Sequence, residues 1–242
     1  MTVRRPEQLP LALPVRPALG REDFLVAGPN ARAVAALDTW REWPQGKFAL
    51  AGPEGAGKSH LLAVWAAETG AVALDGAALP DPGGVAPRAV AVDEADAVAG
   101  VPEAERRLLH LHNRVLGADG RLLLAARTPP ARWPAVLPDL ASRLAATPVA
   151  RIEPPDDALL AAVLVKLFHD RQLAVSSELV GWLVPRMERS FAAADRLVAA
   201  LDARALAGRR PLTRPLAREV LEEDAARTDD ATLPGDARIA EP

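Results

Sequence analysis

Short apolar runs alternate with stretches of helical periodicity over residues 31–152. Five runs are typical of strands buried in a sheet: residues 47–51, 71–74, 89–93, 121–126 and 149–152. Apolar residues recur at helical spacing over residues 31–43, 59–69 and 102–116, and Asn30 is placed to cap the first of these helices. The alternation of strands with helices predicts an α/β fold built on a parallel sheet.

The pattern changes after Pro154 and Pro155. Apolar residues at helical spacing continue over residues 156–169, 176–187, 191–206 and 215–222, with Asp156 as the first cap, and no strand pattern follows. We therefore expect an α/β domain over residues 21–154 and a small all-helical domain over residues 155–223. The proline-rich residues 1–20 predict an extended arm, and the polar, acidic residues 224–242 predict a disordered tail.

Composition narrows the class of protein further. Half of the residues are hydrophobic, which is enough for a substantial core, and no uncharged run is long enough to span a bilayer. The chain has no cysteine, which excludes disulfides and thiolate chemistry and fits a cytoplasmic location. The net charge of −3 argues against a strongly basic protein that coats DNA.

A phosphate-binding loop begins at Gly52. Residues 52–59 read GPEGAGKS and fit the P-loop pattern, and they lie between a predicted strand and a predicted helix. Glycines let successive backbone N–H groups turn toward phosphate oxygens, and the helix N-terminus adds positive potential. Lys58 supplies a mobile charge, and the hydroxyl of Ser59 is a ligand for Mg²⁺. The predicted nucleotide contacts are Gly52, Pro53, Glu54, Gly55, Ala56, Gly57, Lys58, Ser59 and His60.

Two carboxylates end the third predicted strand. Asp93 and Glu94 follow an apolar run about thirty residues after the P-loop, and ligands bind at the carboxyl ends of parallel strands. We predict that Asp93 holds Mg²⁺ together with Ser59, and that Glu94 orients an attacking water. A strand that merely ends in solvent-facing acidic residues is the alternative, which the spacing from the P-loop disfavours.

The plan of a P-loop α/β domain followed by a helical domain resembles the DnaA family of AAA+ ATPases. Residues 23–30 (DFLVAGPN) resemble the segment that opens the AAA+ domain of that family, and residues 137–144 (LPDLASRL) resemble its arginine-finger segment. Residues 156–222 resemble its lid. The resemblance implies a parallel-sheet AAA+ domain with a lid, binding of ADP or ATP with Mg²⁺, and a catalytic role for Arg143 in trans. A core-facing or surface arginine within a loop is the alternative for Arg143. It stops at the lid, without the DNA-binding and N-terminal oligomerisation domains of DnaA.

A short N-terminal peptide narrows the resemblance to the Hda type of this family. Gln8, Leu9, Leu11 and Leu13 lie in QLPLAL, which is similar to the peptide by which Hda-type proteins bind the sliding clamp of the DNA polymerase. The implied partners are the clamp and DnaA, with DNA contacted mainly through the clamp and a homo-oligomer also possible. Leucines that pack on their own domain are the alternative.

The sequence also departs from the family pattern. Arg127 stands where the family places a small polar sensor-one residue, with Thr128 next to it, and Ala192 stands where it places the sensor-two arginine. Arg189 and Arg196 are helical neighbours of Ala192 that could substitute. The resemblance to the family therefore implies weak hydrolysis by the chain itself.

Three functions follow from these observations. The first is a regulator that promotes ATP hydrolysis by DnaA and so inactivates it. The second is an autonomous AAA+ ATPase or helicase loader, and the third is a P-loop kinase, in which residues 137–144 have no role. We read the arginines at 204, 209, 210 and 214 as a solvated helix end rather than a DNA contact, the histidines as unsuited to bind metal, and residues 103–107 as an ordinary helix face.

Overall fold

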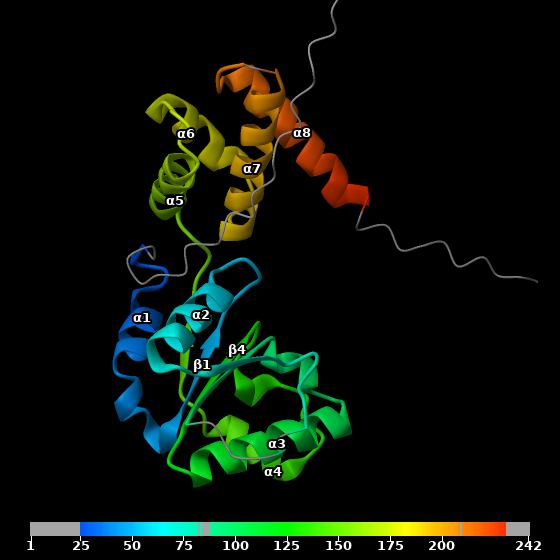
Figure 1. Ribbon diagram of the computed structural model, residues 1–242. Helices are drawn as coiled ribbons and strands as arrows, with labels where there is room; N and C mark the ends of the chain where they lie inside the picture. Colours follow the sequence, from blue (N-terminus) through cyan, green and yellow to red (C-terminus); the bar gives the residue numbers. More distant parts are fainter. Residues whose placement is uncertain (1–24, 82, 84–87, 209, 231–242) are drawn as a thin grey trace, which may run out of the picture.

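The computed structural model describes residues 25–81, 83, 88–208 and 210–230 (Figure 1). Its centre is a five-stranded sheet in the order β2-β3-β4-β1-β5, and every neighbouring pair is parallel. The expected α/β fold with a parallel sheet is confirmed. The strands are β1 (Lys47–Ala51), β2 (Val72–Asp75), β3 (Ala89–Asp93), β4 (Arg121–Ala126) and β5 (Val149–Arg151).

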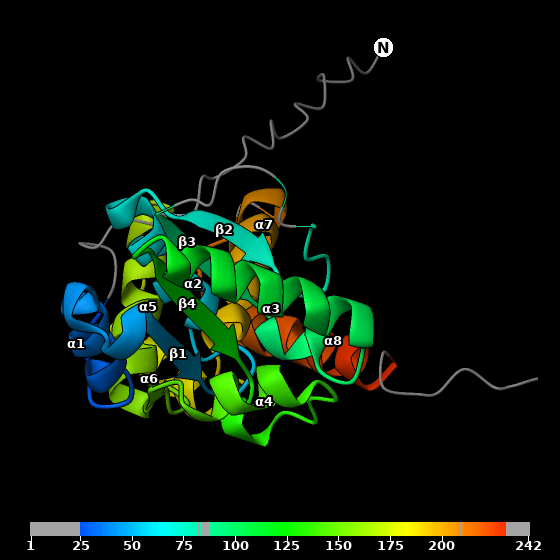
Figure 2. The same ribbon diagram turned by 90° about the horizontal axis from the view of Figure 1, so that it is seen from below.

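Helices cover both faces of the sheet because its strands are apolar on both sides. α1 (Ala31–Asp38) and α2 (Lys58–Thr69) pack on one face, against residues such as Leu50 and Leu123. α3 (Pro102–Gly117) and α4 (Pro138–Ala145) pack on the other, against Leu122, Leu124 and Val92. Figure 2 shows α1 and α3 on opposite sides of the strands. The alternation of side chains along each strand thus divides the core into two layers.

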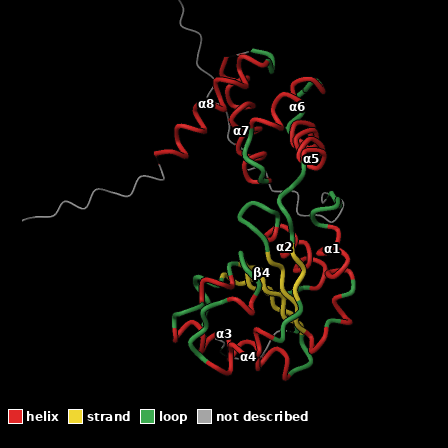
Figure 3. Tube along the Cα trace, turned by 180° about the vertical axis from the view of Figure 1, so that it is seen from behind, coloured by secondary structure: helices red, strands yellow, loops and turns green. Residues whose placement is uncertain are grey.

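The remaining helices form a lid domain above the sheet domain, joined to it by the segment between β5 and α5 (Figures 1 and 3). Asp156 accepts a hydrogen bond of 2.8 Å from the backbone N–H of Leu159, so it caps the first lid helix as the sequence predicts. A separate apolar core, with Phe168 and Leu164 fully buried, holds the lid together. Its helices are α5 (Asp157–Asp170), α6 (Ser177–Leu183), α7 (Phe191–Gly208) and α8 (Arg214–Asp230).

Two helix ends differ from the sequence prediction. α1 stops at Asp38 because carbonyl groups that would continue it accept other hydrogen bonds: the Thr39 hydroxyl donates to Ala35 (3.2 Å) and the Trp43 indole to Ala36 (2.7 Å). A 3₁₀ turn over Trp40–Glu42 follows. α8 continues to Asp230, so residues 224–230 are helical rather than part of a disordered tail.

Asn30 also acts differently from the prediction. Its side chain makes no cap hydrogen bond to α1; it accepts a bond from Ala27 N–H (2.8 Å) and donates one to the Leu25 carbonyl (2.9 Å). The buried amide therefore fixes the loop that precedes α1. Within the described residues, no helix has the length and apolar character needed to cross a membrane.

Candidate nucleotide site

The P-loop connects β1 to α2 in a left-handed turn. Gly55 has φ +71° and Gly57 has φ +92°, and both values lie in the region that favours glycine. Gly57 is the residue before α2, so the loop delivers its N–H groups to the positive end of that helix. Gly52 packs closely on the residue that follows β5, since an added Cβ would lie 2.4 Å from the Ile152 carbonyl oxygen. This backbone fits a bound phosphate.

A cavity of about 300 Å³ opens at the carboxyl ends of β1, β3 and β4. Six of the predicted site residues line it: Glu54, Gly55, Lys58, Ser59, Asp93 and Glu94. The other predicted contacts, Gly52, Pro53, Ala56, Gly57 and His60, belong to the loop and the first turn of α2 but do not line the cavity. Asp96, Ala97, Ala126 and Arg127 complete the lining.

Lys58 is one of two cations that line the cavity. Its Nζ donates a hydrogen bond of 2.7 Å to the carbonyl oxygen of Pro53. Burial lowers the pKa of Lys58 below its ordinary value of 10.5, and the carboxylates of Asp93 and Asp96 act in the opposite direction. The acidic neighbours therefore favour the charged ammonium, which is the form that binds phosphate.

Asp93 and Glu94 lie at the end of β3. Asp93 Oδ1 accepts a hydrogen bond of 2.9 Å from the N–H of Glu94, and Glu94 adopts a left-handed conformation with φ +45°. The side-chain oxygens of Ser59 and Asp93 are suitable ligands for Mg²⁺. This ion commonly takes one or two protein ligands and completes its coordination shell with phosphate oxygens and water. In the described part of the chain, no group of three or more His, Asp or Glu could hold a metal ion unaided.

The structure adds Arg127 and Asp96 to the residues that line the cavity. The sequence predicts Arg127 only as one of two residues at the sensor-one position, and it does not predict Asp96. The backbone N–H of Arg127 donates to Asp96 Oδ2 at 3.0 Å, and its guanidinium Nη2 lies 3.1 Å from Glu54 Oε2. Between the two sensor-one alternatives, Arg127 lines the cavity, whereas the Thr128 carbonyl accepts a hydrogen bond from the Trp133 indole. Asp96 gives only a weak sequence signal, an acidic residue shortly after the Asp93–Glu94 pair.

The lid meets the P-loop at the start of α7. Neither arginine considered as a substitute at Ala192 is directed to the phosphates by a contact in the structure. Arg189 forms an ion pair of 2.7 Å with Asp157, and Arg196 forms one of 3.4 Å with Glu188. All four residues of these two ion pairs belong to the lid.

Arg143 lies on α4, near the amino-terminal end of β1, whereas the cavity lies at the carboxyl ends of the strands. Its carbonyl oxygen accepts a hydrogen bond of 2.8 Å from Nζ of Lys47, the first residue of β1, whereas the P-loop follows the last residue of β1. The strand separates these two ends by roughly 13 Å. The Arg143 guanidinium pairs with Asp139 at 3.1 Å and is 36% exposed. This position excludes a simple contact with its own phosphates and leaves the guanidinium partly exposed, with Nε buried.

Glu105 is a functional support that the sequence prediction missed. It is fully buried, and its carboxylate accepts hydrogen bonds from the N–H groups of Gly100, Val136 and Leu137 at 2.8–3.0 Å. Leu137 is the residue before α4, so Glu105 fixes the start of the helix that carries Arg143. Burial acts to raise the pKa of Glu105, but these three hydrogen bonds together lower it below its ordinary value of 4.5. The prediction of an ordinary helix face for residues 103–107 is wrong at this position.

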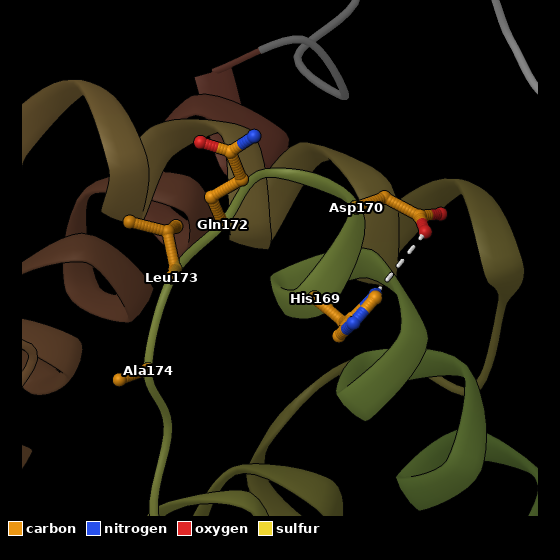
Figure 4. Close-up of a pocket in the computed structure, with 5 residues that line it drawn as sticks. All are labelled: His169, Asp170, Gln172, Leu173 and Ala174. Atoms are coloured by element: carbon orange, nitrogen blue, oxygen red, sulfur yellow. Dashed lines mark ion pairs between the residues drawn. The ribbon is translucent and has the colours of Figure 1, made fainter.

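Other polar features lie outside the cavity. Burial and the nearby Lys47 lower the pKa of His112, a buried residue of α3. A wider hollow of about 530 Å³ lies on the lid; there His169 Nδ1 and Asp170 Oδ1 face each other at 3.9 Å (Figure 4). The His169 side chain is 89% exposed, so this pair is solvated. Arg204, Arg210 and Arg214 each pair with a glutamate, as expected for a solvated helix end.

Comparison with known proteins identifies the lid and the fold. A family model described as the Hda lid domain matches residues 157–221. Domain III of the Thermotoga maritima replication initiation protein DnaA is similar with a TM-score of 0.73 at 15% identity, over 87% of this chain and 98% of that one. AMPPCP-bound DnaA from Aquifex aeolicus is similar with a TM-score of 0.66 at 16% identity, over 89% and 71%. A RuvB mutant from Thermotoga maritima gives 0.63 at 15% identity, over 82% and 70%.

The α/β domain with its helical lid is therefore an AAA+ fold with a P-loop. The lid region over residues 157–221 is similar to the Hda lid domain, and the fold as a whole is similar to that of DnaA domain III.

Proposed function

We propose that the protein is an adenine-nucleotide-binding regulator of chromosome replication initiation. It binds the DNA sliding clamp in the cytoplasm and promotes ATP hydrolysis by DnaA, which inactivates the initiator. The observation that carries this proposal is the Hda lid match, joined in one chain to a P-loop cavity in a DnaA-like fold. An autonomous AAA+ ATPase or helicase loader is the second candidate, because the P-loop and Asp93 are common to both.

The cavity supports binding of ADP or ATP. The N–H groups at the start of α2 and the ammonium of Lys58 would hold phosphates, while Ser59 and Asp93 would hold Mg²⁺. Mg²⁺, when bound, neutralises phosphate charge in a cavity that carries four carboxylates. Glu94, which follows the last residue of β3, would orient a water.

Weak hydrolysis by the chain itself is part of the proposal. Efficient phosphoryl transfer needs cations on the terminal phosphate. Ala192 offers none, and the arginines beside it pair with lid carboxylates. The bound nucleotide then orders the P-loop and the lid that contacts it, and its hydrolysis is not the source of energy for the activity.

Arg143 supplies the activating cation to DnaA. It lies near the amino-terminal end of β1, away from its own cavity, which supports a role toward a neighbouring AAA+ domain. Releasing it from Asp139 breaks an exposed pair worth only about 0–1 kcal/mol. An arginine supplied in trans contributes about 10³–10⁵ in rate, so the exchange is favourable for catalysis.

The clamp contact rests on Gln8, Leu9, Leu11 and Leu13, which lie outside the described residues. An extended peptide can place its leucines in an apolar groove and use the glutamine for hydrogen bonds.

A pull-down from a cytosolic extract tests this function against the alternatives. The tagged protein is presented with ADP or ATP, with Lys58→Ala as the matched variant that lacks the phosphate-binding cation. Recovery of both clamp and DnaA by the wild type supports the regulator. Recovery of a helicase instead, together with rapid ATP turnover by the isolated protein, supports the second candidate.

A further inference from the structure

An ion pair crosses the mouth of the nucleotide cavity. Arg127 extends from the end of β4, and Glu54 stands in the P-loop; the atoms Nη2 and Oε2 are 3.1 Å apart. The two segments are adjacent because the N–H of Gly52 donates to the carbonyl of Ala126 at 3.2 Å. Asp96 fixes the backbone of Arg127 through a hydrogen bond of 3.0 Å. The guanidinium therefore projects from an anchored backbone toward a loop that is itself shaped for phosphate.

The charges that line the cavity are unequal. Four carboxylates, at Glu54, Asp93, Glu94 and Asp96, face two cations, at Lys58 and Arg127. Lys58 stands in the first turn of α2, where a P-loop lysine reaches the outer phosphates. Arg127 is the second cation among the lining residues, and in the structure Glu54 already pairs with it.

We propose that the Glu54–Arg127 pair makes the site discriminate between nucleoside diphosphates and triphosphates. This inference rests on the proposed nucleotide binding. The P-loop cradles the inner two phosphates, so a third phosphate extends into the part of the cavity bordered by Arg127 and Glu54. A diphosphate leaves the pair intact. A triphosphate must take the guanidinium from Glu54 and tolerate that carboxylate beside it.

The two residues act in opposite directions on the third phosphate. Arginine binds phosphate with parallel charge-assisted hydrogen bonds, so Arg127 attracts the outer group once it is released. Glu54 repels the same group and neutralises the guanidinium. Since the side chains are 66% and 82% exposed, replacing either one creates no cavity in the core.

Calorimetry with ADP and with AMPPCP, each with Mg²⁺, tests the discrimination without interference from hydrolysis. Glu54→Gln should raise the affinity for AMPPCP by up to about fivefold, and Arg127→Gln should lower it by a similar factor. In both variants the affinity for ADP should change less than the affinity for AMPPCP. Glu103→Gln is the matched control, since that exposed glutamate pairs with Arg106 on α3, outside the cavity lining.

The outcome separates this inference from the proposed function. Equal changes for the two nucleotides, or no change in either variant, would overturn the discrimination while nucleotide binding stands. A wild-type protein that binds neither ADP nor AMPPCP would instead overturn the nucleotide site itself. Thermal melting of each variant confirms that the compared proteins are folded.

Discussion

The backbone N–H of Phe191, the first residue of α7, donates a hydrogen bond of 2.9 Å to the carbonyl oxygen of Gly55 in the P-loop. The lid thus rests directly on the phosphate-binding loop. The neighbouring side chains reinforce the contact: an added Cβ at Gly57 would lie 3.0 Å from the Phe191 ring, and one at Gly55 would lie 2.3 Å from Cβ of Ser190. Phosphate binding and lid position therefore share the same backbone.

Gly55→Ala should weaken ADP binding and lower the melting temperature. The substitution places a side chain at φ +71° and forces Ser190 away from the loop. Gly70→Ala is the matched control, because Gly70 has φ +68° and an added Cβ there meets no atom within 4 Å. The control isolates the cost of the left-handed conformation, about 1 kcal/mol. Calorimetry and thermal melting should show a larger loss for Gly55→Ala; equal losses would contradict the close packing of lid on loop.

The sequence predicts the elements of this fold better than it predicts the contacts between them. Strands such as residues 89–93 and the P-loop are visible because each depends on local pattern and spacing. The pairing of Arg127 with Glu54, and of Lys47 with the Arg143 carbonyl, joins residues far apart in the chain. Their partners depend on the order of the strands, which local periodicity does not contain.

The sequence contains a signal that Glu105 is buried. This residue lies three residues before Leu108 and seven before His112, on the buried face of α3. A glutamate on an apolar helix face must find hydrogen-bond donors, because an unpaired buried carboxylate is costly. The sequence thus indicates that Glu105 needs donors, but the loop that supplies them is identified only by the fold.

Glu105→Gln should destabilise the protein in a pH-dependent way. The folded protein binds the proton less tightly than the unfolded chain, since the pKa of Glu105 is lowered by folding. The ionised carboxylate therefore stabilises the fold above pH 4.5, and this contribution is lost as the pH falls through the folded pKa. At neutral pH, hydrogen bonds to a charge are replaced by weaker ones, a loss of roughly 1.5–3 kcal/mol.

Denaturant unfolding at pH 7 and at pH 4 measures this difference. The difference in free energy of unfolding between wild type and Glu105→Gln should be smaller at pH 4 than at pH 7. Glu103→Gln, on the exposed side of the same helix, should change stability little at either pH. A constant difference for Glu105→Gln would show that its carboxylate is not what holds the start of α4.

Replacing Leu11 and Leu13 with alanine should abolish binding to the clamp and preserve the melting temperature. Each leucine buried in a groove contributes about 1.5–3 kcal/mol, enough to dominate the affinity of a short peptide. Surface plasmon resonance on immobilised clamp measures the binding. A double variant that keeps clamp binding but melts earlier would show that these leucines pack on their own domain.

The rate of ATP hydrolysis by DnaA, measured with the protein and clamp-loaded DNA, tests the central claim most directly. Wild type should accelerate hydrolysis, whereas Arg143→Ala should lose most of a stimulation that reaches about 10³ or more for an arginine supplied in trans. Arg106→Ala, an exposed arginine on α3, is the matched control and should stimulate as wild type does. We expect Arg143→Ala to keep its fold, its nucleotide and its clamp binding. Stimulation by Arg143→Ala at the wild-type rate would contradict the account.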